Sequence, residues 1–212
     1  MSRTAVPLLR HLRSMMDAPA LATHTDREML DSFASRRDEA AFAALVRRHG
    51  PMVHNVCWHV LRQEQDAEDA FQAVFLVLVR KAASLGSVVS VVGWLHAVAH
   101  RTALSARKSA ARRQAHPKPP PAAEPEQPVA EASLLELQAL LDAEVARLPD
   151  KLRSPFVLCC LEGHSKAEAA RELAWKEGTV SSRLAQAGGG HAGQLTGRIA
   201  SRIGRPGRPQ TM

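Results

Sequence analysis

Hydrophobic residues recur along this chain at helical spacing, in blocks separated by turn-forming residues. Two stripes of this kind in the first block are Phe42, Leu45 and Val46, and then Val53, Val56, Cys57 and Val60. An apolar residue at every third or fourth position marks one face of an amphipathic helix. The pattern predicts a helix capped at Asp26, a second helix start near Asp38, a stop at Gly50-Pro51, and a separate helix beyond it.

The segment from Asp66 to Lys81 is apolar on almost every side. One face carries Phe71, Val74, Phe75 and Leu78, and the apolar surface is widened by Leu76, Val77 and Val79. The acids Asp66, Glu68 and Asp69 are expected in the first turn, where the helix dipole favours negative charge. A helix this apolar is either central to its module or covered by a partner.

A Val-rich connector, GSVVSVV, leads into the last helix of this block. The residues expected to face inward are Trp94, Leu95, Val98 and Ala99, and the cations that follow are Arg101, Arg107, Lys108, Arg112 and Arg113. Cations beside an aromatic ring suit single-stranded nucleic acid, because they neutralise the backbone while bases stack on the ring. With one aromatic the stacking is weak, and an ordinary solvated basic face is the alternative.

The C-terminal block predicts a helix-turn-helix. A Leu-rich helix ends at LPD, the next is expected to start at Pro155, and Ser165 with Glu168 forms a capping box for a third. After a tight turn at 175–177 a last helix begins. Ala170 is expected where the two helices cross. The small core is assigned to Leu173, Trp175, Val180 and Leu184.

This arrangement leaves a polar face on the last helix. Its residues are Glu177, Thr179, Ser181, Ser182, Arg183 and Gln186. Short hydrogen-bonding side chains near a helix N-terminus fit a major groove, and Arg183 can reach a guanine edge or a phosphate. An ordinary helical hairpin with a solvated face is the alternative. The run Gly188–Gly190 predicts fraying at Gly188, because each interior Gly costs about 1 kcal/mol relative to Ala.

Between the two blocks lies a proline-rich stretch, residues 116–132, which we expect to be an extended linker without regular helix or sheet. The predicted organisation is a tail at 1–23, a helical module at 24–115, the linker, a helix-turn-helix module at 133–187 and a Gly- and Arg-rich tail at 188–212. The predicted fold class is therefore all-α, with two small helical domains on a tether.

Composition and charge narrow the function classes. Of the 212 residues, 45% are hydrophobic but 4% are aromatic, which favours helical bundles over β-sandwiches. A net charge of +7 points to a polyanionic partner: nucleic acid, an anionic membrane or an acidic protein face. No apolar run approaches the ~20 residues of a membrane span, and the N-terminal segment is a poor signal peptide. We therefore expect a cytoplasmic protein.

Catalytic and metal chemistry find little support in the sequence. Cys57, Cys159 and Cys160 show no disulfide or metal spacing, and we expect all three to be small buried thiols in a reducing compartment. His96 and His100 are four residues apart, as two metal ligands can be, but no third ligand accompanies them. The phosphate-loop and nucleophile motifs are missing. We expect no enzyme activity, no cofactor and no metal.

Three segments, in order, resemble the sigma-70 family of bacterial RNA polymerase sigma factors, in its extracytoplasmic-function (ECF) group. The family's core-binding helix is similar to DAEDAFQAVFLVLVRKA, and its promoter-melting and −10 helix to GWLHAVAHRTALSARKSAARR. Its −35 domain is similar to LPDKLRSPFVLCCLEGHSKAEAARELAWKEGTVSSRLAQA. The resemblance runs from about Asp26 to Ala187, broken by the linker.

The resemblance implies a sigma factor that binds core RNA polymerase and directs promoter recognition and melting, with no catalysis of its own. The residues it assigns to the polymerase clamp helices are Asp66, Glu68, Asp69, Phe71 and Gln72. Those it assigns to −10 DNA are Trp94, Arg101, Arg107 and Lys108, with the loop 84–92 where relatives capture a flipped base. Those it assigns to −35 duplex are Lys176, Glu177, Thr179, Ser181, Ser182, Arg183 and Gln186. An anti-sigma factor is a further partner that it allows.

The sequence departs from the family at three places. Its capture loop is apolar where relatives are polar, which puts base capture by side-chain hydrogen bonds in doubt. Ala174 and Lys176 stand where relatives often have Gly and Pro, and the glycine run replaces a basic helix. Two further hypotheses stay open: a helix-turn-helix regulator that acts on duplex DNA without polymerase, and a degenerate paralogue that binds polymerase but reads −35 DNA poorly.

Overall fold

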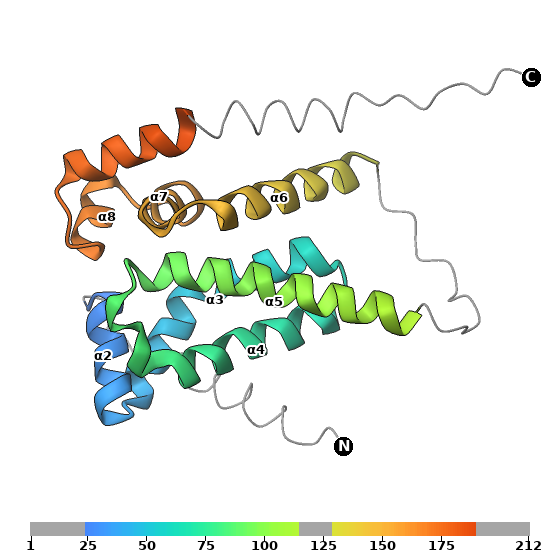
Figure 1. Ribbon diagram of the computed structural model, residues 1–212, viewed down its shortest axis with the longest axis horizontal. Coiled ribbons are helices and arrows are strands. Elements are labelled where there is room, and N and C mark those ends of the chain that lie inside the picture. The colour runs from blue at the N-terminus through green and yellow to red at the C-terminus, as the bar shows by residue number, and fades with distance from the viewer. Residues whose placement is uncertain (1–23, 115–128, 190–212) are drawn as a thin grey trace, which may run out of the picture.

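The computed structural model describes residues 24–114 and 129–189, and within them it holds helices and turns but no strand (Figure 1). The first module consists of α2 (Asp26–Arg36), α3 (Glu39–Leu61), α4 (Glu64–Lys81), the 3-10 segment η3 (Ala82–Ser87) and α5 (Val91–Gln114). The second consists of α6 (Val129–Arg147), α7 (Asp150–Phe156), the π-helical segment η4 (Val157–Leu161), α8 (Lys166–Glu172) and the helix of residues 177–189. The all-α prediction is confirmed.

Side-chain caps fix several helix starts. Asp38 accepts hydrogen bonds from the backbone N–H groups of Ala40 and Ala41, as predicted. The Ser165–Glu168 capping box is also present. The prediction for α2 is wrong by one residue, because Thr25 is the cap and Asp26 is the first helical residue. Thr25 is favoured there because Glu28, three residues on, completes a capping box with it.

The predicted break at Gly50-Pro51 is wrong, because α3 runs unbroken through Pro51. A proline inside a helix removes one hydrogen bond and costs about 3 kcal/mol. The buried stripe continues in helical phase on both sides of the proline, and its members are Leu45, His49, Met52, Val53, Val56, Cys57 and Val60. Each fully buried apolar side chain contributes about 1.5–3 kcal/mol, so the combined burial outweighs the proline.

The predicted start at Pro155 is also wrong, because this proline lies inside α7, which begins at Asp150. A proline cannot donate to the carbonyl four residues earlier, which here is that of Lys151. The Arg183 guanidinium lies 3.4 Å from this carbonyl oxygen and donates to it. A side chain from the last helix therefore donates to the carbonyl that Pro155 cannot serve.

The two modules pack directly against each other, although the sequence predicted them on a tether. In Figure 1, α6 and α7 lie alongside α5, and all three contact one another. Val92 and Leu95 of the first module share one apolar core with Val145, Val157 and Leu158 of the second. The predicted linker lies largely outside the described residues, but its last part is helical, because α6 begins at Val129. Pro128 directly before that start is compatible with it, since prolines are tolerated at helix N-termini.

The cysteines are less buried than the sequence predicted. Cys57 is buried, and burial raises the pKa of its thiol to about 12. Cys159 is half-buried and Cys160 is exposed, so the prediction of three buried thiols is wrong for Cys160, which lies in the π-helical segment η4. Within the described ranges, no group of three or more His, Cys, Asp or Glu could hold a metal ion. No helix there has the length and apolarity needed to cross a membrane.

Candidate nucleic-acid and polymerase interfaces

The helix-turn-helix is closed by a turn with a left-handed residue. Ala170 of α8 and Leu173 directly after it are buried, as predicted, in one cluster with the fully buried Val180. Ala174 has φ 52°, where a Cβ crowds the following carbonyl. The backbone N–H of Trp175 then donates to the Ala170 carbonyl at 2.8 Å, which ends the helix. The turn therefore needs the conformation that glycine adopts most readily.

The polar face predicted for the last helix is largely open to solvent. The exposed residues are Lys176, Glu177, Ser182 and Gln186, and the half-buried ones are Thr179, Ser181 and Arg183. The Arg183 guanidinium lies 4.4 Å from the centroid of the Trp175 ring, in a cation–π contact. The Arg183 guanidinium also donates to the Lys151 carbonyl, so these two contacts hold the Arg183 side chain in one direction across the turn.

The glycine run does not end this helix where the sequence predicted. The helix covers residues 177–189, so Gly188 and Gly189 are helical and Gly190 lies outside the described residues. The buried Ala187 packs near Leu148 and Leu152, which anchors the last turn before the glycines. Tertiary packing therefore carries the helix further than propensity alone indicates.

The α4 helix presents a mixed surface. Its buried stripe is Ala67, Ala70, Val74, Phe75 and Leu78, and Leu76 on the opposite side is 46% exposed. The helix begins at Glu64, so Asp66 lies in the first turn, whereas Glu68 and Asp69 fall one turn later than predicted. Of the other residues assigned to polymerase, Phe71 and Gln72 are half-buried. The centroids of the Phe71 and Phe75 rings lie 5.0 Å apart, so Phe71 also contributes to packing.

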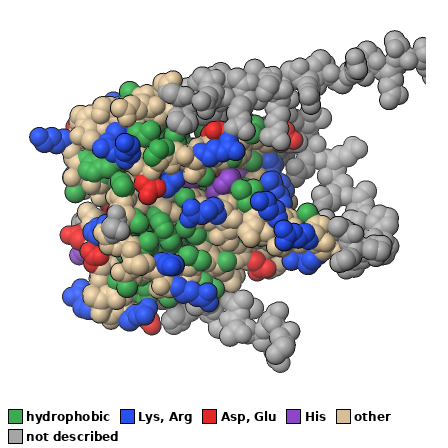
Figure 2. Space-filling model, in the orientation of Figure 1, with side chains coloured by type: hydrophobic (Ala, Val, Ile, Leu, Met, Phe, Trp, Pro, Cys, Tyr) green, Lys and Arg blue, Asp and Glu red, His purple; other side chains and the backbone are tan. Residues whose placement is uncertain are grey.

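Along α5, three of the residues assigned to −10 DNA follow one line. Trp94, Arg101 and Lys108 are seven residues apart, which is two helical turns. Trp94 is half-buried, and the Arg101, Arg107 and Lys108 side chains are exposed. Arg101 and Arg107 also line a groove of about 830 Å³ between α5 and α6, together with Arg62, Arg147, His59 and His100. Figure 2 shows Lys and Arg side chains gathered on this face.

Hydrogen bonds from α2 hold the loop before α5 in place. The Arg27 guanidinium donates to the carbonyls of Leu85 at 3.1 Å and of Val88 at 2.9 Å. Val91 and Val92 are buried in the core as the first residues of α5, while Val89 is 37% exposed. The valines of this segment therefore serve mainly packing, which explains an apolar sequence at this position.

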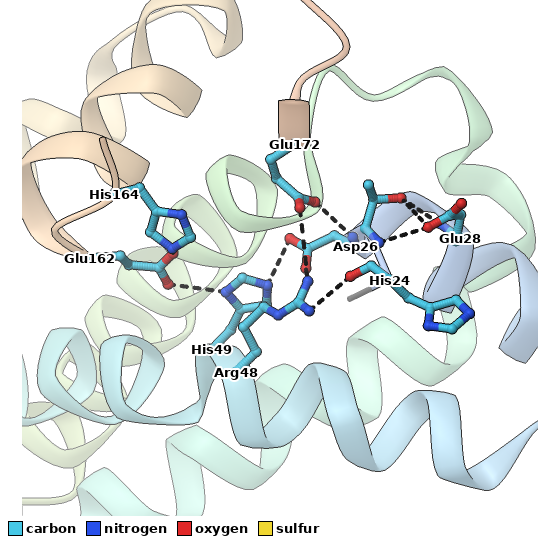
Figure 3. A network of polar contacts seen from close by, with 9 residues as sticks. His24, Asp26, Glu28, Arg48, His49, Glu162, His164 and Glu172 are labelled. Carbon is cyan, nitrogen blue, oxygen red and sulfur yellow. Dashed lines mark hydrogen bonds and ion pairs between the residues drawn. The ribbon is translucent and has the colours of Figure 1, made fainter. Parts of the chain in front are cut away.

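Sequence reasoning missed a buried network of charged residues between the modules (Figure 3). His49 of α3 is 1% exposed, with Nε2 2.7 Å from the Asp26 carboxylate and Nδ1 3.0 Å from the Glu162 carboxylate. Burial opposes its charge, but the two carboxylates raise the pKa of His49 to about 10. Arg48 pairs with Asp26 at 2.8 Å, and the Asp26 backbone N–H donates to Glu172 at 2.6 Å.

The network also shifts the pKa values of its carboxyl groups. Burial alone would raise the pKa of Asp26, but the charges and hydrogen bonds of His49 and Arg48 hold it below its ordinary value. The pKa of Glu172 is raised, first by burial and then by the nearby Asp26. In the sequence these residues look like ordinary charged helix positions, so no pattern marks them as buried.

A second carboxylate joins two histidines of the first module. Asp142 of α6 lies 2.7 Å from His59 Nδ1 and 3.3 Å from His96 Nε2. Burial would raise the pKa of Asp142, but the hydrogen bonds and charges of the two histidines lower it. His96, considered above as a metal ligand, therefore faces a carboxylate from the other module. His100 is buried beside it, and burial lowers its pKa.

Two protein-family models match the chain, one on each module. The model described as Sigma-70 region 2 matches residues 45–113, and that of Sigma-70, region 4 matches residues 138–187. Together they span more than half of the chain. The chain belongs to the sigma-70 family. We call α2–α5 region 2, and we call α6 through the helix 177–189 region 4.

Similar proteins place it in the ECF group. The ECF RNA polymerase sigma factor SigM of Mycobacterium tuberculosis is 34% identical over 179 residues, 84% of this chain and 83% of SigM. SigE of Mycolicibacterium smegmatis is 29% identical over 187 residues, 83% of this chain and 71% of SigE. Among solved structures, CnrH in complex with the cytosolic domain of CnrY is 20% identical with a TM-score of 0.41, and covers 83% of this chain and 97% of CnrH. The protein is an alternative sigma factor, which directs RNA polymerase to promoters.

Proposed function

We propose that this sigma factor binds polymerase and promoter DNA through three separate surfaces. Region 2 docks α4 on the clamp helices of core RNA polymerase, using Asp66, Glu68, Asp69, Phe71 and Gln72. The line along α5, which is Trp94, Arg101 and Lys108 with Arg107 beside it, contacts the melted −10 strand and the upstream duplex. The helix 177–189 enters the major groove of the −35 element. The factor acts in the cytoplasm and supplies specificity and melting, while polymerase performs the chemistry.

The observation that carries this proposal is the exposed polar face of the helix 177–189. Its N-terminal residues are short donors and acceptors that a major groove accommodates. On α4, the exposed Leu76 lies on a helix that is otherwise packed by its opposite face. A protein partner docked on this face would bury the Leu76 side chain, which would add favourable apolar burial.

Run-off transcription with purified core polymerase and the full chain, on a set of candidate promoters, tests the proposal. We expect transcripts that depend on both the factor and the promoter. Duplex binding without polymerase association would support the regulator hypothesis instead. Polymerase binding without initiation would support the degenerate-paralogue hypothesis.

A further inference from the structure

Four arginines line the groove of about 830 Å³ between α5 of region 2 and α6 of region 4. Arg101 and Arg107 belong to α5, Arg147 ends α6, and Arg62 directly follows α3. Lys and Arg side chains gather on this face of the molecule (Figure 2). Each planar guanidinium presents donors in a fork that matches the oxygens of a phosphate group. Guanidinium groups that converge from three helices therefore suit a ligand with several phosphates.

The positive charge of this groove is largely uncompensated. Among the described residues that line it, the one carboxylate is that of Glu136. Within the described part of the chain, Arg101 and Arg107 make no hydrogen bond or ion pair. Arg147 pairs with Glu144 at 2.7 Å, but its side chain is 58% exposed and keeps further donors. The groove thus offers more positive charge than its own acids neutralise.

A histidine in the wall of the groove records this excess of positive charge. The pKa of His100 is lowered first by burial and then by the neighbouring His96. Arg107 and Arg147 lower it further, while Asp142 acts in the opposite direction. The two arginines therefore lie close enough to disfavour another cation in the groove. An anion bound between them would relieve this repulsion.

Apolar side chains lie between the arginines of the groove. Val60 and Ala97 are buried, and Leu104, Leu140 and Ala143 are half-buried. Sites for small molecules combine an apolar lining with a few charged groups, and they occupy roughly 300–1,000 Å³. An aromatic base can pack on such a lining while phosphates attached to it reach the arginines. The groove therefore fits a ligand that carries both parts.

The groove is not simply an extension of the surface proposed for −10 DNA. Trp94 and Lys108, which belong to that surface, do not line it. Its second wall is α6, which supplies Arg147 and Glu136 from region 4. A concave site walled by two regions encloses a compact ligand better than an extended strand, since it offers contacts on two sides.

We propose that the groove between α5 and α6 binds a nucleoside di- or triphosphate. Arg62, Arg101, Arg107 and Arg147 hold the phosphates, and the base packs on the apolar lining. This site goes beyond promoter recognition, and it does not depend on the assignment of α5 to DNA. Because both regions line it, the bound ligand also stabilises the packed arrangement of the two regions by mass action.

The test titrates adenosine triphosphate into the full chain by isothermal calorimetry at about 0.15 M salt. EDTA in the buffer keeps divalent cations from neutralising the phosphates. Inorganic triphosphate and adenosine, each carrying one half of the ligand, are the comparison compounds. No DNA or polymerase is present, so the result is separate from run-off transcription.

Four variants assign the binding to the groove. Ala139→Glu places a carboxylate at a half-buried lining position of α6, and Ala139→Gln is its neutral control of nearly equal size. Both new residues are good helix formers. Glu136→Gln removes the carboxylate of the groove, and a gain of affinity in this variant cannot come from loss of the fold. Arg80→Gln combined with Arg171→Gln removes two exposed cations that do not line the groove.

We expect adenosine triphosphate to bind at least about tenfold more tightly than inorganic triphosphate or adenosine, because only the whole ligand uses both parts of the site. Ala139→Glu weakens this binding about tenfold relative to Ala139→Gln. Glu136→Gln strengthens it about threefold. The Arg80 and Arg171 pair stays within about twofold of the parent, because distant exposed charges are screened. Bound ligand slows amide exchange in α5 and α6.

Equal affinity of the two Ala139 variants would overturn the proposal, as would an equal loss in the Arg80 and Arg171 pair, which would indicate diffuse attraction. Inorganic triphosphate binding as tightly as adenosine triphosphate would overturn the assignment of a nucleotide. If a single-stranded oligonucleotide is the ligand that responds to Ala139→Glu and adenosine triphosphate does not bind, the groove belongs to the DNA surface and the proposal fails. If nucleotide binds but run-off transcription fails, the proposed function has failed and the site stands.

Discussion

Ala174 adopts a backbone conformation that is costly for alanine. The left-handed region costs a non-glycine residue roughly 1–2 kcal/mol, while glycine loses about 0.5–1 kcal/mol of extra entropy on folding. Ala174→Gly is therefore expected to raise the free energy of unfolding by about 0.5–1 kcal/mol, measured by urea titration. Ala185→Gly, in an exposed helical position, makes the same replacement and should lower it by about 1 kcal/mol. Equal effects at both sites would contradict this account of the turn.

Arg183 makes a cation–π contact with Trp175 and donates a hydrogen bond to the Lys151 carbonyl, so its guanidinium has partners within the protein. If it reaches a base, Arg183→Ala costs about 1–3 kcal/mol of −35 affinity and relaxes the sequence preference at one position. Arg171→Ala removes the same charge from an exposed position of α8 and should weaken all duplexes alike. Fluorescence anisotropy with matched and scrambled duplexes separates the two effects, and no change for Arg183→Ala would remove it from the site.

At the scale of single helices, periodicity predicted where most helices lie but not where two of them continue. Pro51 and Pro155 are local stop signals, and both sit inside helices. Contacts from elsewhere in the fold outweigh the local effect of each proline. For Pro51 these are the buried side chains of α3 beyond it, and for Pro155 they include a donor from another helix. A sequence window around either proline shows neither kind of contact, so propensity alone gave the wrong boundary.

Gly188 and Gly189 weaken the end of the helix 177–189 without any steric need. A Cβ built at either position meets nothing within 4 Å. Gly188→Ala with Gly189→Ala is therefore expected to stabilise the helix by about 1 kcal/mol per residue and to slow amide exchange in residues 177–189. If −35 affinity also rises, fraying limits DNA binding in the parent chain. Faster exchange in the variant would show that the glycines serve a packing role.

Leu76 supplies the test of the α4 surface. Because it is 46% exposed, Leu76→Ser should change the free energy of unfolding by less than about 0.5 kcal/mol. If polymerase buries it, the variant loses about 1–2 kcal/mol of affinity for core polymerase in a pull-down titration. Leu137→Ser, on the 39% exposed Leu137 of α6, is the matched control and should leave that affinity unchanged. Equal losses would place the polymerase contact elsewhere.

At the scale of the whole molecule, the sequence predicted two modules but not their docking. Three charged or polar residues join them: His49 and Asp142 lie within helices that also carry exposed charges, and Glu162 directly follows η4. Periodicity assigns such residues to solvent, and their partners lie as far as 113 positions away in the chain. The faces proposed to bind DNA and polymerase each lie within one module. They could therefore be assigned from local motifs without knowing how the modules pack together.

The His49 link gives the stability of the molecule a definite pH dependence. A folded-state pKa of about 10, above the ordinary 6.5, contributes stability that is complete below pH 6.5 and is lost as pH rises through 10. Urea unfolding between pH 7 and pH 9.5 should therefore show a decline of up to about 1.4 kcal/mol per pH unit. His49→Gln lowers stability at neutral pH and flattens this slope. An equally steep decline in that variant would assign it to another group.

Pro155 of α7 influences the position of a charged side chain on another helix of region 4. Because a proline cannot donate to the carbonyl four residues earlier, the Lys151 carbonyl accepts from Arg183, which is tied to α7 as well as to Trp175 in the turn. The backbone hydrogen bonding of α7 and the position of the Arg183 side chain are thereby linked. A substitution at Pro155 would therefore also affect the helix 177–189.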